Sequence, residues 1–170
     1  MLNIKKIFKN FNLRLVVLEC ISLVFIISGI KRFYIAYNGK LYDVLMNEDW
    51  EKHELINNSS ISELFVNEIY WFLTTLLISI LVIVLINWKN KFGHINSIAV
   101  IIITLGISST EFYSSGFINR YLNYFCGIFA DGFGMAFLVG GSIILLVGVL
   151  ILWKTITLHK KQNINNDKTY

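Results

Sequence analysis

Long apolar runs without charged residues alternate with short polar segments along this chain. The clearest run is 69–88, IYWFLTTLLISILVIVLINW, which lies between Glu68 and Lys89, and a second occupies 132–153, between Asp131 and Lys154. A helix needs about 20 apolar residues to cross a hydrocarbon core roughly 30 Å thick. Each run therefore predicts a membrane-spanning helix.

Two further runs have the same character but contain a charged residue. Residues 95–110 are uncharged and extend past Glu111, which predicts a span over about 95–113. Residues 15–30 are interrupted by Glu19 and continue through Lys31 and Arg32, which predicts a first span over about 13–34. A cleaved secretory signal is a poor alternative for this segment, because its apolar core is too long and has no small-residue cleavage site.

The pattern as a whole predicts an all-α polytopic membrane protein, a four-helix up-down bundle that occupies 15–153. A basic segment, 1–14, precedes the bundle, and a polar tail, 154–170, follows it. The last part of this tail, KKQNINNDKTY at 160–170, is predicted to be disordered. In the first loop, around 36–67, the segment KLYDVLMNEDWEKHELI has the apolar spacing of a short amphipathic helix at the membrane surface.

Charge predicts the orientation of this bundle, because Lys and Arg are retained preferentially on the cytoplasmic side. Ten of the 15 Lys and Arg residues flank the chain ends and the connection between spans two and three. The other five fall on the opposite, outer side with most of the acidic residues; they are Lys31, Arg32, Lys40, Lys52 and Arg120. Both termini are therefore predicted to be cytoplasmic.

Composition agrees with the bilayer as the surrounding solvent. Hydrophobic residues make up 55% of the 170 positions, and the mean hydropathy is +0.62, above the range of ordinary soluble domains. The net charge of +4 then reflects topology, and no basic motif with interleaved aromatic residues indicates nucleic-acid binding. His53 beside Glu54 is too little for a metal site, and no motif indicates a cofactor or a conventional enzyme.

Small residues in the fourth span predict close helix packing. Gly134, Gly141 and Gly148 recur every seven residues, and Gly140 is adjacent to this stripe. Such a stripe lets a neighbouring backbone approach, so helix contact is the favoured interpretation over a ligand site.

Two acidic residues within or beside the spans are candidate functional groups. An ionised carboxylate at Glu19 would be costly unless it faced a partner or water, so it serves either a function or a structural ion pair with Arg14. Glu111 is nearer the outer end of span three, where it is either solvated or functional.

The two cysteines, Cys20 and Cys126, are predicted to lie at different depths. Cys20 is roughly 18 Å below the outer end of its helix at 1.5 Å per residue, whereas Cys126 belongs to the outer loop before span four. A disulfide requires Cα atoms within about 7 Å, so an intramolecular bridge is not expected. Cys126 is left as a lone thiol on the side where mixed or intermolecular disulfides persist.

Two segments resemble the MauE and DoxX group of four-helix membrane proteins. The first span, LRLVVLECISLVFIISGIKRFY, resembles the opening helix of that group, which ends with Ser-Gly followed closely by Lys, here Ser28, Gly29 and Lys31. The segment CGIFAD resembles the CGCFGD-type segment before the last helix, and its matching residues are Cys126, Gly127, Phe129 and Asp131.

The resemblance implies a bacterial inner-membrane protein that takes part in redox maturation or assembly of an envelope or periplasmic partner. Ile128 replaces the second cysteine of the family segment, so either Cys126 works with a thiol of the partner, or the redox function is lost and the scaffold retained. Two other classes stay open: a non-enzymatic binding, immunity or accessory protein, and a small proton-coupled carrier that depends on Glu19. Homo-oligomerisation is also left open.

Overall fold

The computed structural model describes residues 11–46, 58–111 and 116–167, and these form six helices and no strand. The helices are α2 (Leu13–Tyr37), α3 (Gly39–Met46), α5 (Asn58–Lys89), α6 (His94–Glu111), α7 (Phe117–Gly127) and α8 (Phe133–Asp167). The prediction of an all-α protein is confirmed over this part of the chain.

Three of these helices are long and apolar enough to cross a membrane. The apolar stretches are Leu13–Tyr37, Ile61–Lys89 and Phe133–Lys161, whereas that of α6, His94–Thr110, is shorter. Large apolar side chains such as Leu77 on α5 and Leu146 on α8 are exposed. Contact of so much apolar surface with water would be unfavourable. Long apolar helices with apolar outer surfaces fit an integral membrane protein.

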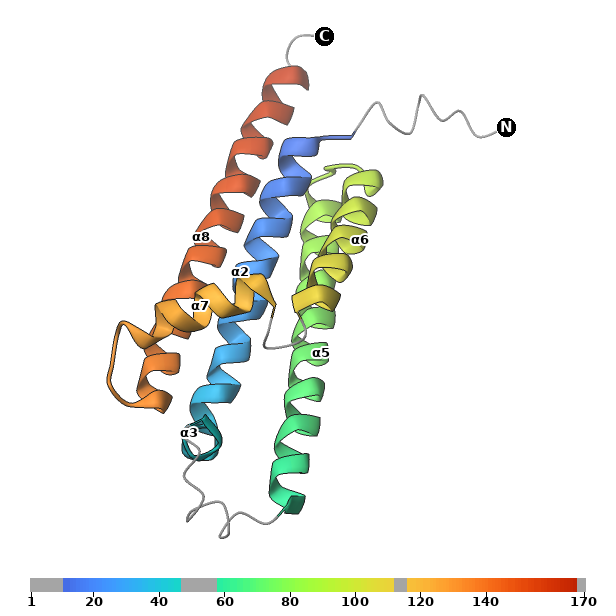
Figure 1. Cartoon of the computed structure of the whole chain (residues 1–170). Helices are drawn as coiled ribbons and strands as arrows, with labels where there is room; N and C mark the ends of the chain where they lie inside the picture. The colour runs from blue at the N-terminus through green and yellow to red at the C-terminus, as the bar shows by residue number, and fades with distance from the viewer. Residues whose placement is uncertain (1–10, 47–57, 112–115, 168–170) are drawn as a thin grey trace.

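Helix α2 is the centre of the arrangement. It packs most extensively along α8 and also contacts α5, α6 and α3. The start of α2 and the end of α8 lie at one end of the molecule, and α3 and the start of α5 lie at the other (Figure 1). The amphipathic helix α7 crosses α2 and packs against α8, so it closes one side of the group of long helices (Figure 1).

Glycines set the distance between α2 and α8. A Cβ atom added at Gly29 would lie 2.7 Å from the backbone nitrogen of Leu145, and one added at Gly141 would lie 2.8 Å from the Cβ atom of Arg32. A Cβ atom added at Gly148 would lie 2.9 Å from the backbone nitrogen of Ile26. These positions have no room for a side chain, which is the arrangement expected where two helix backbones approach closely. Gly134 instead lies against Gly39, at the start of α3.

Polar groups fix the end of the molecule where α2 begins. The side chain of Asn12 accepts a hydrogen bond from the backbone N–H of Leu15 at 3.1 Å and so caps α2. The backbone N–H of Asn12 donates to Oδ1 of Asn96 at 2.8 Å, which connects the start of α2 to α6. Lys91 and Gly93, both at positive φ, form the turn between α5 and α6.

Three expectations concern the segments beside the long helices, and the structure changes two of them. Helix α8 continues to Asp167, so the prediction of a disordered segment is wrong for 160–167, because the helix of the last span extends through the polar residues. The predicted amphipathic helix is present as α3, while its continuation through Trp50 and His53 lies outside the described residues. Cys126 lies in helix α7 and is buried, not in an open loop.

We expect Gly29→Ala to lower the free energy of unfolding by about 1–3 kcal/mol, because the added methyl group overpacks the contact with α8. Gly106→Ala on α6 is the matched control, since a Cβ atom there meets nothing within 4 Å. The control should be neutral or stabilising by up to about 1 kcal/mol, owing to the higher helix propensity of Ala. Unfolding in detergent micelles measures both, and equal effects of the two substitutions would contradict the close contact.

Candidate functional site

Two adjacent cations of α2 lie inside the protein. Lys31 is 6% exposed and Arg32 is 0% exposed. The sequence pattern assigned both residues to the outer end of the first span, whereas α2 continues to Tyr37 and carries them into the packed interior. Because an unpartnered charge is costly in such a place, their partners define the candidate site.

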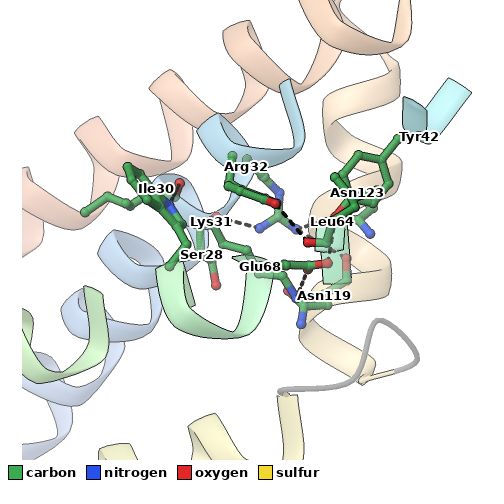
Figure 2. A network of polar contacts seen from close by, with 11 residues as sticks. Ser28, Ile30, Lys31, Arg32, Tyr42, Leu64, Glu68, Asn119 and Asn123 are labelled. Carbon is green, nitrogen blue, oxygen red and sulfur yellow. Dashed lines mark hydrogen bonds and ion pairs between the residues drawn. The ribbon is translucent and has the colours of Figure 1, made fainter. Parts of the chain in front are cut away.

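Lys31 is held by a carboxylate of α5. Its Nζ atom lies 3.2 Å from Oε1 of Glu68 and 5.9 Å from the centroid of the Phe72 ring. The other carboxylate oxygen, Oε2, accepts a hydrogen bond of 2.6 Å from the hydroxyl of Tyr42 on α3 (Figure 2). Glu68 thus joins three helices, α2, α3 and α5.

Arg32 is held by neutral acceptors. Its Nη1 atom donates to the carbonyl of Ser28 at 2.8 Å, and Nη2 donates to the carbonyl of Asn119 at 3.3 Å and to Oδ1 of Asn123 at 2.7 Å (Figure 2). Its Nε atom is buried without a hydrogen-bond partner. The guanidinium therefore ties α7 to α2 while its positive charge faces no carboxylate among the described residues.

A cavity of about 370 Å³ adjoins both cations. Its wall comes from α2, α3, α5, α7 and the start of α8. The polar lining residues are Lys31, Arg32, Tyr42, Glu68, Asn119 and Asn123, and the apolar ones are Ile35, Leu45, Phe65, Ile69, Phe72, Phe133 and Phe137. An apolar chamber with a few convergent polar groups is the usual form of a small-molecule site.

Cys126, the candidate catalytic residue, is buried in α7 beside Arg32. A Cβ atom added at Gly140 would lie 2.4 Å from its Sγ atom, so the glycine of α8 makes the space that the thiol occupies. Burial raises the pKa of the Cys126 thiol, and the nearby Arg32 charge acts in the opposite direction. Cys20 is also free and buried, but it packs with Val16 in a different cluster.

The other residues of the family-like segments do not gather around Cys126. Gly127, Phe129 and Asp131 are exposed. Ser28 contributes its carbonyl to Arg32, Gly29 contacts α8, and Lys31 pairs with Glu68. The structure therefore places the first segment at the polar site and leaves most of the second on the surface.

Glu19 has a partner that the sequence did not indicate. It is fully buried, and its Oε2 atom accepts a hydrogen bond of 2.9 Å from Nδ2 of Asn87 on α5. Arg14, the alternative partner, is exposed, and the ion pair recorded among the described residues is that of Lys31 with Glu68. The side chain of Glu111 lies outside the described part of the structure.

Within the described residues, no group of three or more His, Cys, Asp or Glu side chains is placed to hold a metal ion. The polar cluster contains one carboxylate, one phenol, two amides and two cations, which is a donor set better suited to a ligand with a negative charge than to a cation.

Sequence reasoning missed Arg32, Tyr42, Glu68, Asn119, Asn123 and Asn87 as site residues. A signal for some of them exists in α7, because Asn119, Asn123 and Cys126 are spaced by four and three residues and therefore share one helix face. The persistence of the apolar pattern beyond Lys31 and Arg32 is a second signal. No sequence pattern indicates that Glu68 and Asn87 contact α2.

Comparisons with known protein families, with curated proteins and with solved structures found no match. The resemblance to the MauE and DoxX group therefore stays a prediction from the sequence, and the arrangement of the site supplies the basis for a functional proposal.

We expect Tyr42→Phe to lower the free energy of unfolding by about 1.5–3 kcal/mol at pH 7, because it removes a hydrogen bond to a charged acceptor. Burial and the bond to Glu68 raise the pKa of Tyr42 above its ordinary value of about 10. The difference in unfolding free energy between wild type and Tyr42→Phe should therefore be fully present below pH ~10. It should shrink above that pH, because the Tyr42 hydroxyl ionises first in the unfolded state.

The exposed Tyr121 on α7 provides the matched control as Tyr121→Phe. Its substitution should change the unfolding free energy by less than about 0.5 kcal/mol, as is usual for surface positions. Chemical unfolding in detergent at several pH values measures both variants, and a Tyr42→Phe protein as stable as wild type at pH 7 would show that the bond to Glu68 contributes little.

Proposed function

We propose that this chain is a four-span integral membrane protein of the MauE and DoxX type that acts as an accessory factor for an envelope partner, without thiol chemistry of its own. The observation that carries the proposal is the state of Cys126. It is completely buried, it has no second cysteine beside it, and it packs against a glycine of α8.

Thiol exchange makes demands that this site does not meet. The attacking species is an accessible thiolate, and a second nearby thiol must resolve the mixed disulfide. Burial that raises the pKa of Cys126 disfavours the thiolate. Ile128, at the position of the family's second cysteine, is 66% exposed and cannot substitute for it. These features support a retained scaffold whose redox function is lost.

The helix lengths and charges support four spans with both termini in the cytoplasm, and the family resemblance implies a bacterial inner membrane. Helix α6 has 18 residues, which corresponds to about 27 Å at 1.5 Å per residue and is close to the thickness of the hydrocarbon core. Ile98 and Ile102 on its surface are exposed and suited to lipid. The excess of Lys and Arg at the chain ends favours the cytoplasmic side for them.

A surface for a protein partner is available on α7. Phe117, Tyr121 and Tyr124 are exposed and spaced by four and three residues, so they form one aromatic face of this helix. The rings of Phe117 and Tyr121 lie 4.7 Å apart. Exposed aromatic residues are enriched at protein interfaces, and in the proposed topology this face lies on the outer side of the membrane.

Trapping of free thiols in intact cells, followed by separation without reductant, tests the proposal. We expect wild type and Cys126→Ser to show the same pattern, with no disulfide-linked adduct, and cross-linking through α7 to capture the same partner from both. Cys20→Ser serves as the matched control for loss of a buried thiol. An adduct that depends on Cys126 would instead establish redox exchange with an envelope protein, which the proximity of Arg32 to this thiol would assist.

The topology is tested by single cysteines introduced at Lys40 and at Lys160 in a Cys20→Ser, Cys126→Ser background. Both positions are exposed, on α3 and near the end of α8. We expect a membrane-impermeant maleimide to label position 40 in intact cells and position 160 only after permeabilisation. Labelling of both positions, or of neither, before permeabilisation would contradict four spans with cytoplasmic ends.

A further inference from the structure

The cavity beside α2 has an excess of positive charge. Its described lining residues include two cations, Lys31 and Arg32, and one carboxylate, Glu68. Glu68 is already engaged by Lys31 and by the hydroxyl of Tyr42. Glu63, the other acidic residue near this end of α5, is exposed and is not part of the lining. The charge of Arg32 is therefore uncompensated within the cavity wall.

The hydrogen bonds of Arg32 position it without neutralising it. Its partners are the carbonyl and amide oxygens of Ser28, Asn119 and Asn123, together with the thiol of Cys126, and none of them is a carboxylate. Its Nε atom is buried and unpartnered, and the residue lines the cavity. A guanidinium in this state is suited to a carboxylate or a phosphate, because either anion accepts charge-assisted hydrogen bonds from it.

The rest of the cavity is suited to hydrocarbon. Four phenylalanines, Phe65, Phe72, Phe133 and Phe137, form much of the wall together with Ile35, Leu45 and Ile69. Phe65 and Ile69 on α5 are also partly exposed, at 49% and 38%. Both belong to the apolar stretch of α5 that is long enough to cross a membrane. The apolar side of the cavity thus borders a surface that faces lipid, and not a polar surface.

We infer that this cavity binds an amphipathic anion from the membrane, with its single carboxylate or phosphate group beside Arg32 and its hydrocarbon chain against the phenylalanines. The volume of about 370 Å³ is within the range of roughly 300–1,000 Å³ for small-molecule sites and suits a headgroup with part of one chain. This goes beyond the proposed accessory role, which requires a protein partner but no ligand.

Binding to the purified full-length protein in a neutral detergent tests the inference by native mass spectrometry. The probes are palmitate, palmitoyl lysophosphatidic acid, and two matched amphiphiles without net charge, hexadecanol and palmitoyl lysophosphatidylcholine. We expect one equivalent of an anionic probe to bind at least tenfold more tightly than either uncharged probe. Preference for palmitate would identify a fatty-acid carboxylate as the ligand, and preference for the lysophosphatidic acid a lipid phosphate.

Substitutions of arginine separate the cavity from general charge attraction. Arg32→Gln should weaken binding of the anionic probe at least tenfold and leave hexadecanol unchanged. Arg120→Gln removes an exposed positive charge from α7, outside the cavity, and should alter binding less than twofold. Equal affinity for charged and uncharged probes, or full anion binding by a folded Arg32→Gln protein, would overturn the inference.

A second pair of variants decides the matter if Arg32→Gln does not fold. Glu68→Gln removes the carboxylate from the cavity and releases Lys31, so anion binding should tighten about threefold or more. Glu63→Gln removes an exposed carboxylate from the same helix and should have no effect. Anion binding that does not tighten in Glu68→Gln would overturn the inference. Because these measurements need neither Cys126 nor a partner, their outcome is independent of the thiol-trapping experiment.

Discussion

The close contact between α2 and α8 is the constraint on which the rest of the structure depends. Gly29 and Gly141 leave so little space that the backbones of the two helices meet, and the Cβ atom of Arg32 occupies the volume that a side chain at Gly141 would fill. The neighbouring Gly140 makes the corresponding space for Cys126 of α7. Two adjacent glycines therefore place the central helix and the crossing helix on the same segment of α8.

The polar residues of α2 then determine how the remaining helices pack. Lys31 forms an ion pair with Glu68 of α5, and Arg32 donates hydrogen bonds to Asn119 and Asn123 of α7. Glu19 accepts a hydrogen bond from Asn87 of α5. A buried polar group left without a partner is costly, and a lipid-facing surface offers no water as a substitute. The polar residues at both ends of α2 thus fix the register of α5, while the apolar cluster between them provides the bulk of the packing.

The packing of α2, α7 and α8 separates the Cys126 thiol from the cavity that Lys31 and Arg32 line. The thiol of Cys126 is enclosed by the α7 and α8 contact and is held in an environment that disfavours the thiolate. Arg32, which lies beside this thiol, and Lys31 border a chamber with apolar walls. A site with an enclosed thiol and a charged, hydrocarbon-lined cavity is better suited to holding a molecule than to exchanging disulfides, which is the physical basis of both proposals.

The sequence by itself determined the helical character, the long apolar helices and the glycine stripe, because hydropathy and residue size are local properties that a helix displays directly. It also indicated Lys31 and Cys126, although as residues of the outer side and not of the interior. Only the tertiary structure decided that Arg32 meets Asn119 and Asn123, and that Glu19 meets Asn87, since these partners lie 87, 91 and 68 positions apart. Such pairings depend on helix crossing and rotation, which no local pattern encodes.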